Sequence, residues 1–527
     1  MRVLAISLPV EAPTYVCLKP TSFLGKELFV EYQEATLGTV FDPKTKANLC
    51  PEHAWAQVHM QLEEAGFEVS CDGQAITWLN IAVFRQVKQD AAAEERILRM
   101  NAALASQGKV LRNYQLEGIR RLVRQRAALL TDEPGVGKTP QALVAIPENV
   151  GVIVDAPASL RLMWRDEIRR WRPDLSPLVN PENVDWPSPG QVYIISDSWV
   201  KTRVQTQPWR SLPKSLFLIS DEAHRYKGRS ARTDAMQSLC AEIRRNGGAT
   251  MGLTGTPLQN RPAELYTLCL VFGAARKAFG GWGAYTKNWN CKRGRFKELI
   301  WGEPNEKIRE GFARVSLRRT RAEVLPELPA KTWEAISSEA SVRVLDALDR
   351  VDTEDVDRWE RGEVEEPMCA RDARLRARLA KEKWDDCVEW IKRQEEDETD
   401  DTPLVVFSMH RFVVDKLKER PGWAVITGDT TPLRRNDAVS AFQAGKLRGI
   451  ALTIQSGGVG LTLTAAHRVL FVDLPFNPAE VDQAEDRVCR FGQTRPVLIS
   501  RLVTDHPLEK RLDAILWAKR QMARSVL

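Results

Sequence analysis

One stretch of eight residues constrains the fold of this chain more than any other. It reads Asp132-Glu133-Pro134-Gly135-Val136-Gly137-Lys138-Thr139, follows the apolar run Ala127–Leu130 and precedes a helix-like segment that opens with Pro140. A strand, a glycine-rich turn and a helix in this order are typical of a phosphate-binding loop, whose backbone N–H groups face an anion. The sequence therefore predicts an α/β fold that binds a nucleotide through residues 132–139.

Two side chains of this stretch have expected roles of their own. Lys138 would reach the β and γ phosphates, and the Thr139 hydroxyl would hold a Mg²⁺ ion that bridges them. The strict pattern has glycine where this chain has Asp132, and Gly-Lys-Thr tripeptides also occur in ordinary loops. An ordinary turn is therefore the alternative interpretation until other motifs support the first.

Length and composition limit the class of protein. A chain of 527 residues suggests about three domains at ~150 residues each. No apolar run approaches the ~18 residues that span a bilayer. The nine cysteines form no Cys-x-x-Cys pair and the six histidines have no metal-ligand spacing, which favours a reducing, cytoplasmic location without a structural zinc ion.

Basic residues are clustered along the chain, although the net charge is only +6. For any single cluster a solvated helix face is the better interpretation, but several clusters together fit a track for a polyanion. The clusters are Arg161–Arg170, Arg225–Arg232, Lys292–Arg295, Arg318–Arg321 and Arg434 with Arg435.

Two acidic residues follow the next strongly apolar strand. The run Leu216–Ser220 delivers Asp221 and Glu222, followed by Ala223-His224. At the carboxyl end of a strand, Asp221 would orient the Mg²⁺ shell and Glu222 would polarise an attacking water. An isolated Asp-Glu pair is usually a surface pair, and only its place after the phosphate loop favours the catalytic interpretation.

Several further residues have positions that suit a nucleotide or DNA site. Gln115 precedes the loop with Arg112, and its amide can read the adenine edge. Ser159 begins a helix and could bind a phosphate, whereas Trp164 and Trp171, seven apart, favour core packing. The hydroxyls of Leu253-Thr254-Gly255-Thr256 could relay movement between two ligands, or form a simple Gly-Thr turn.

A second α/β unit begins with the strand Leu404–Phe407 and has no phosphate loop of its own. It continues through a helix at Arg434–Phe442 and Gly457–Thr462 to Asp482–Gln493, which we expect on one helix. Gln483, Arg487 and Arg490 then share a face, from which two guanidinium groups could reach phosphate charge on the Lys138 side. An exposed arginine helix is the alternative.

The order of these motifs resembles the Swi/Snf family of DNA-dependent ATPases, within the superfamily-two nucleic-acid motors. The resemblance covers residues 106–510 and is most specific at Gln483–Gln493. Leu461-Thr462 and Phe407–Arg411 are similar to the annealing-helicase (HepA-related) subgroup. Pro134, Cys489 and Pro507-Leu508-Glu509 depart from the family pattern without removing a phosphate-contacting group.

The resemblance implies two RecA-like lobes with ATP and Mg²⁺ between them and double-stranded or branched DNA across both. We expect an accessory α+β domain (1–100), a first lobe (101–333, helical insertion 262–333) and a second lobe (334–527, with a linker at 334–402, an α/β unit at 403–510 and a terminal helix at 507–527). A DEAH-box-like Asp221–His224 and nucleotide contacts by Gly460 follow from it. The DNA contacts it implies are Ser159, Arg161, Arg229, Thr256, His410, Arg411, Arg435 and Thr462.

The function that the resemblance implies is an ATP-dependent translocase on duplex DNA, monomeric and from a bacterial or phage cytosol, with a possible role at forks or branches. Two alternatives stay open at this point. One is a nucleotide-controlled DNA-binding clamp without productive turnover, which the intact Lys138, Glu222, Arg487 and Arg490 disfavour. The other is a strand-separating DNA or RNA helicase.

Overall fold

A computed structural model gives the fold of the chain from residue 90 onward and several strands before it. The described residues are 90–125, 127–182, 185–206, 212–294, 299–338, 370–397, 399–457, 461–505 and 507–527, with 3–7, 15–20, 40–42, 47–51, 58, 62 and 68–71 in the N-terminal region.

The N-terminal region contributes five strands to one mixed sheet in the order β3-β4-β2-β1-β5. Strand β1 pairs antiparallel with β2 and parallel with β5. Most of the expected accessory domain lies outside the described residues. The strands are β1 (Val3–Ser7), β2 (Tyr15–Pro20), β3 (Val40–Asp42), β4 (Ala47–Pro51) and β5 (Glu68–Cys71).

A seven-stranded, fully parallel sheet forms the first lobe, in the order β14-β6-β11-β10-β7-β9-β8. Its inner strands are buried apolar runs, as parallel strands covered on both faces must be. The strands are β6 (Ala127–Leu130), β7 (Val152–Asp155), β8 (Ser176–Val179), β9 (Gln191–Ile195), β10 (Phe217–Asp221), β11 (Ala249–Leu253) and β14 (Ser316–Leu317).

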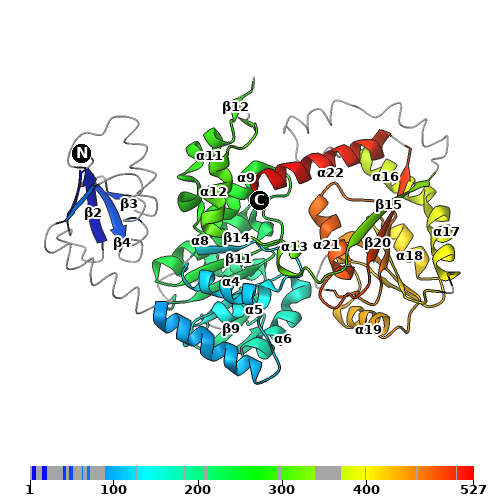
Figure 1. Ribbon diagram of the computed structural model, residues 1–527, viewed down its shortest axis with the longest axis horizontal. Helices are drawn as coiled ribbons and strands as arrows, with labels where there is room; N and C mark the ends of the chain where they lie inside the picture. The colour runs from blue at the N-terminus through cyan, green and yellow to red at the C-terminus, as the bar shows by residue number, and fades with distance from the viewer. Residues whose placement is uncertain are drawn as a thin grey trace.

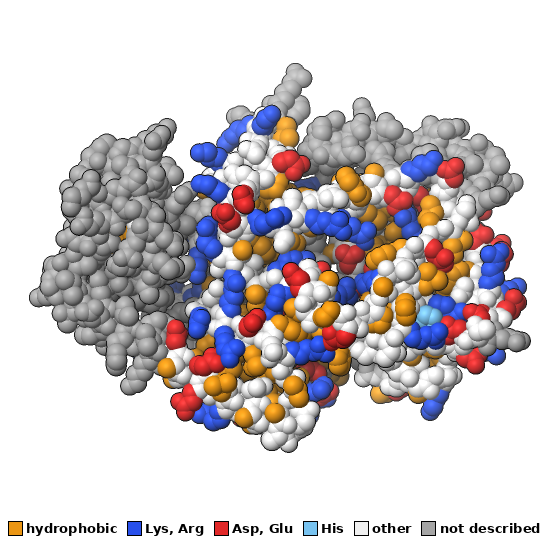
Figure 2. All heavy atoms as spheres, in the orientation of Figure 1, with side chains coloured by type: hydrophobic (Ala, Val, Ile, Leu, Met, Phe, Trp, Pro, Cys, Tyr) orange, Lys and Arg blue, Asp and Glu red, His pale blue; other side chains and the backbone are white. Residues whose placement is uncertain are grey.

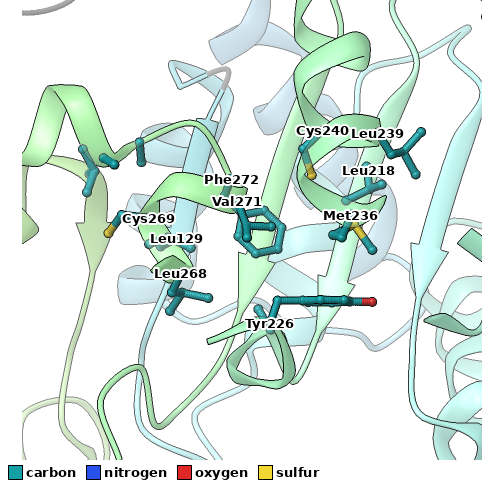
Figure 3. Packing of buried hydrophobic residues seen from close by; sticks show 14 of the residues in the cluster. Leu129, Leu218, Tyr226, Met236, Leu239, Cys240, Leu268, Cys269, Val271 and Phe272 are labelled. Carbon is teal, nitrogen blue, oxygen red and sulfur yellow. The ribbon is translucent and has the colours of Figure 1, made fainter. Parts of the chain in front are cut away.

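Helices cover both faces of this sheet (Figure 1). They are α4 (Asn113–Val123), α5 (Lys138–Ala145), α6 (Arg161–Trp171), α7 (Asp197–Thr206), α8 (Ala231–Arg245) and α9 (Pro262–Val271). Figure 3 shows one of the two resulting cores, to which α8 contributes Met236, α9 contributes Leu268 and the sheet contributes Leu129 and Leu218.

Beyond α9 the chain forms a helical extension of the first lobe around an aromatic cluster. The Tyr285 ring is buried and lies 4.6 Å from the Phe279 ring and 6.2 Å from the Trp289 ring. Its elements are α10 (Ala275–Phe279), α11 (Trp282–Asn288), β12 (Lys292–Arg293), β13 (Leu299–Ile300), α12 (Glu306–Val315) and, after β14, α13 (Arg321–Val324).

The second lobe contains a six-stranded parallel sheet in the order β15-β20-β19-β16-β18-β17. Its strands are β15 (Lys331–Ser338), β16 (Leu404–Ser408), β17 (Trp423–Ile426), β18 (Gly449–Thr453), β19 (Arg468–Phe471) and β20 (Val497–Thr504). Its helices are α16 (Ala370–Glu382), α17 (Trp384–Glu395), α18 (Arg411–Leu417), α19 (Pro432–Gln443), α20 (Ile454–Gly457), α21 (Pro478–Val488) and α22 (Pro507–Val526).

The expected fold class is confirmed, since both lobes are parallel sheets flanked by helices. Figure 1 shows α22 running from the second lobe back to the first, where the chain ends beside α9. There the Lys519 ammonium donates to the Asn260 side chain at 2.7 Å, and Arg309 of α12 donates to the carbonyl of Arg524 at 3.2 Å. Among the described residues, no helix is both long and apolar enough to cross a membrane.

Candidate nucleotide site between the lobes

The glycine-rich stretch is a tight turn between β6 and α5. Gly137 has a φ of 81°, in the left-handed region, and is the residue from which α5 begins. The Lys138 ammonium donates to the carbonyls of Asp132 at 2.7 Å and Glu133 at 3.0 Å, so it lies inside the turn. Burial lowers the pKa of Lys138, an effect that the nearby Glu222 carboxylate opposes. The turn therefore holds one cation at its centre.

Gln115 and Arg112 lie beside this turn, at the start of α4. The Gln115 side chain accepts from the Arg112 N–H at 3.0 Å and donates to the Val136 carbonyl at 3.4 Å. A Cβ atom at Gly137 would lie 2.4 Å from Gln115 Nε2, so only glycine allows this approach. The Arg112 guanidinium pairs with Glu327 and lies 5.2 Å from the Phe491 ring of the second lobe.

Asp132 occupies a position that the sequence alone could not interpret. Its carboxylate is fully buried, 2.5 Å from the Arg319 guanidinium, and accepts from Gln141 at 3.2 Å. The side chain therefore anchors the turn from behind. Lys138 donates to the main-chain carbonyl of Asp132 and not to its carboxylate.

Asp221 and Glu222 lie at the carboxyl end of β10, as predicted. Asp221 accepts from the Trp164 indole N–H at 2.8 Å and from the Glu222 N–H at 3.0 Å. Glu222 has a φ of 50°, a left-handed conformation that residues with side chains adopt mainly where function or packing demands it. This backbone turns its carboxylate to within 3.2 Å of the His224 Nδ1 atom.

The pKa values of the two adjacent carboxyl groups are shifted in opposite directions. Loss of hydration and the charge of the neighbouring Glu222 carboxylate together raise the pKa of Asp221 to about 6. Burial also acts to raise the pKa of Glu222, but the hydrogen bond from His224 and the charges of His224, Lys138 and Arg487 together lower it to about 2. Glu222 is therefore the more acidic member of the pair and stays ionised where Asp221 takes up a proton, as a residue that polarises water must.

The Thr254-Gly255-Thr256 segment contacts both the glycine-rich turn and His224, the hydrogen-bond partner of Glu222. The Thr254 hydroxyl lies 3.1 Å from His224 Nδ1 and accepts from the Thr256 N–H at 3.1 Å. A Cβ atom at Gly255 would lie 2.7 Å from Pro134 Cδ, so the glycine lets the two turns pack together. The Thr256 hydroxyl in turn accepts from Gln259 at 2.9 Å.

The prediction of one helix from Asp482 to Gln493 is wrong. Helix α21 ends at Val488, and the Gln493 amide donates to the Val488 carbonyl at 3.3 Å and to the Ala466 carbonyl at 2.6 Å. Arg490 therefore does not share a helix face with Arg487 and Gln483. The sequence could not reveal this end, because it depends on carbonyls of a loop more than twenty residues away.

Arg490 nevertheless faces the first lobe. Its guanidinium donates to the Leu461 carbonyl at 3.0 Å and the Thr462 hydroxyl at 3.1 Å. Its Cβ atom lies 3.8 Å from the point that a Cβ atom on Gly135 would occupy. The loop after α21 thus contacts the glycine-rich turn directly.

Arg487, on the last turn of α21, lies within range of the carboxylates of the first lobe. Burial and the nearby charge of Arg490 together lower the pKa of Arg487 to about 10, while Glu222 and Asp221 act in the opposite direction. The guanidinium is therefore still charged at neutral pH. Gln483 is half-buried on the same helix, and Gly460 lies outside the described residues.

The residues predicted to contact DNA are distributed over both lobes. In the first lobe, Ser159 and Arg229 are exposed and Arg161 bonds to Asn180. In the second lobe, His410 bonds to Asp473 and Arg411 pairs with Asp415 and Asp429, while Arg435 is half-buried. Thr462 and Thr256 are already hydrogen-bonded within the site described above.

Sequence reasoning missed two functional features. The spacing of Trp164 predicts core packing, and the side chain is fully buried, but its indole N–H also donates to the Asp221 carboxylate. The basic cluster at 318–321 predicts part of a polyanion track, whereas Arg318 donates to the carbonyls of Thr131 and Gly255 beside the turn. Neither role leaves a local signal, because both partners are distant in the sequence.

Fold and site together define a class: a two-lobed RecA-like protein whose glycine-rich turn and acidic pair face arginines of a second parallel sheet. Two family models match the chain, the SNF2-related domain over residues 94–381 and the helicase conserved C-terminal domain over residues 382–492. The chain belongs to the SNF2-related family. The expected family and its enzyme class, helicase-like ATPases, are confirmed.

Curated relatives agree with this assignment. The human DNA annealing helicase and endonuclease ZRANB3 is 28% identical over 440 residues, covering 79% of this chain and 40% of the relative. The Bos taurus SWI/SNF-related matrix-associated actin-dependent regulator of chromatin subfamily A-like protein 1 is 31% identical over 437 residues, covering 78% and 44%. The chain thus spans less than half the length of these relatives.

Among solved structures, the Sulfolobus solfataricus SWI2/SNF2 ATPase core in complex with dsDNA matches with 20% identity and a TM-score of 0.36. The match covers 79% of this chain and 92% of that chain.

The raised pKa of Asp221 generates a prediction about pH. Below about pH 6 this carboxyl is protonated, so Mg²⁺·ATP should bind less well and kcat/KM for ATP should fall as the pH drops through that value. In Trp164→Phe the hydrogen bond that lowers the pKa of Asp221 is lost, so the acidic limb of the profile should move to higher pH.

The matched control is Trp171→Phe, which removes a 2.8 Å hydrogen bond to Glu167 on the same helix. Its kcat/KM profile should superimpose on that of the wild type. An unchanged profile in Trp164→Phe would contradict the role given to its indole.

A second prediction concerns the contact of Gly255 with Pro134. In Gly255→Ala the methyl group would meet the proline ring at 2.7 and 2.8 Å, and a rigid ring cannot yield. We expect the free energy of unfolding of the first lobe to fall by about 1–3 kcal/mol and ATP affinity to fall with it. Denaturant unfolding and nucleotide titration measure the two effects. Gly228→Ala, which meets nothing within 4 Å, should change neither.

Proposed function

We propose that this protein is an ATP-dependent translocase on double-stranded DNA, and that ATP is hydrolysed between its two lobes. The observation that carries the proposal is the contact between the lobes at this site, where Arg490 of the second lobe lies against Gly135 of the first and the charges of Arg487 and Glu222 shift each other's pKa. A site that needs both lobes makes hydrolysis depend on how they sit together, which is what a motor requires. Since one chain supplies both halves, a monomer suffices.

The residues present fit ATP and Mg²⁺. The turn at 134–139 offers backbone N–H groups and the Lys138 ammonium for the phosphates, and the Thr139 hydroxyl and Asp221 carboxylate are the hard oxygen ligands that Mg²⁺ prefers. Bound there, Mg²⁺ would neutralise charge on the phosphates. Glu222, kept ionised, would accept a proton from the attacking water, and Arg487 and Arg490 would stabilise the charge that develops on the phosphate.

Duplex DNA is the proposed track. Figure 2 shows Lys and Arg side chains spread over both lobes on the viewed face, with acidic side chains among them. Of the predicted contacts, Arg229 and Ser159 are exposed in the first lobe and Arg411 in the second. Such contacts bind the phosphate backbone and not the bases, so binding should be independent of sequence and should weaken steeply with salt.

The test of the translocase is displacement of a third strand from a DNA triplex, which needs movement along a duplex without unwinding it. The wild type should displace the strand only with ATP. Lys138→Ala should lose nucleotide binding, Glu222→Gln should bind ATP without turnover, and Arg487→Ala should lower kcat by up to ~10³-fold. Arg393→Ala is the control, because this exposed arginine pairs, within the part of the chain that the structure describes, with Glu389 on its own helix.

The results separate the rival functions. ATP binding with no turnover in the wild type would indicate a DNA-binding clamp, and unwinding of a tailed duplex without triplex displacement would indicate a strand-separating helicase. Names of the relatives include an annealing helicase, and we extend the proposal to branched DNA on that ground. ATPase rates with duplex, single-stranded and forked DNA and with RNA, measured side by side, test this extension, and equal rates on forked and linear duplex would contradict it.

A further inference from the structure

The segment that leaves the first lobe runs alongside the phosphate-binding turn. Strand β14 pairs with β6, and the pairing continues past the strand, where Thr131 N–H donates to the Leu317 carbonyl at 2.7 Å and Glu133 N–H to the Arg319 carbonyl at 3.0 Å. The first half of the turn is thus hydrogen-bonded to residues 317–319. We call residues 316–321 the arginine strap.

Each of three consecutive residues at the start of the turn is held by its own arginine of this strap. Arg318 donates to the Thr131 carbonyl at 2.9 Å, and Arg319 lies 2.5 Å from the Asp132 carboxylate. The Arg321 N–H donates to the Glu133 carboxylate at 2.9 Å, and its guanidinium Nε lies 3.6 Å from the same oxygen.

Arg321 also reaches the second lobe. Its guanidinium pairs with the buried Asp486 carboxylate and donates to the Cys489 carbonyl at 2.9 Å. These two acceptors immediately precede Arg487 and Arg490 in the chain. The Arg321 side chain therefore contacts both the glycine-rich turn and the two residues that precede Arg487 and Arg490.

A second cation supports the same end of α21. The Lys331 ammonium, on the first residue of β15, lies 3.0 Å from Asp486 and 3.3 Å from Glu485. Burial disfavours the charge on Arg321, but Asp486 and Glu133 outweigh it and raise the pKa of that guanidinium. Arg321 is thus a fixed charge between two carboxylates from different lobes.

We propose that Arg321 is a positioning residue for ATP hydrolysis: it holds the end of α21 against the phosphate-binding turn and so sets where Arg487 and Arg490 stand. The proposal rests on the hydrolysis site proposed above. It also takes Arg321 out of the polyanion track, because its guanidinium lies between the carboxylates of Glu133 and Asp486 and donates to the Cys489 carbonyl. A purely structural ion pair would instead affect stability without affecting turnover by the folded protein.

The experiment measures kcat and KM for DNA-stimulated ATP hydrolysis by the full chain. Arg321→Ala should lower kcat by about 10²-fold, the cost of displacing catalytic groups by an ångström, with a small change in KM for ATP. Arg321→Lys should recover part of the loss, since an ammonium can pair with one carboxylate but cannot span both and the carbonyl. As the control, Arg245→Ala removes an exposed arginine that pairs with Glu242 on its own helix, and it should match the wild type.

The decisive comparison is the double variant Arg321→Ala/Arg487→Ala. If Arg321 acts through the arginines of the second lobe, the double variant should be no more than slightly slower than Arg487→Ala alone. The proposal would be overturned if the kcat losses of the two single variants multiplied in the double variant. A wild-type kcat in Arg321→Ala would also overturn it, whatever the melting temperature of that variant. If instead Arg487→Ala and Glu222→Gln both hydrolyse ATP like the wild type, the two-lobe site itself is wrong, and the positioning role falls with it.

Discussion

The structure depends on the pairing of buried charges at the boundary between its two sheets. Asp221 and Glu222 lie on one side of that boundary with Lys138, and Arg487 and Arg490 lie on the other. Charges removed from water are costly unless partners of opposite sign accompany them. The charge of Arg487 helps to lower the pKa of Glu222, and the charge of Glu222 favours the charged form of Arg487. Each lobe therefore contributes to the charge balance of the site, and a bound nucleotide would enter that balance as a further set of negative groups.

The path of the chain between the lobes makes this pairing specific. The chain leaves the first sheet at β14, next to the strand that leads into the phosphate-binding turn, and joins the second sheet at β15, whose first residue is Lys331. Along those few residues it supplies the turn with Arg318, Arg319 and Arg321 in order. The segment that connects the lobes is thus also part of the wall of the site. A change in how the lobes are arranged would therefore act directly on the backbone around Lys138.

Prediction from sequence succeeded where structure depends on local order along the chain. Residues close to them in the sequence predict the turn at 132–139 and the acidic pair after β10. Parallel strands then bring both to one edge of a sheet. It failed where partners are distant. The end of α21 is fixed by the Gln493 amide, and the arginines at 318–321 look like any solvated basic cluster until Asp132 and Asp486 lie beside them. Burial of a charged residue is a property of the fold, and spacing alone does not reveal it.

The contacts around Glu222 suggest how DNA could influence hydrolysis. From Glu222 a series of short contacts leads through His224 and Thr254 to Thr256, and then through Gln259 to Asn477 of the second lobe at 3.4 Å. Coupling requires an element with two arrangements that both ligands bias, and under the proposed function the pair of lobes would be that element. The contact between Gln259 and Asn477 is long and lies at the boundary that closure would change. A closure that brought Arg487 to the phosphates would therefore also alter the hydrogen bonds that orient Glu222, and would tie Glu222 and the arginines to one movement.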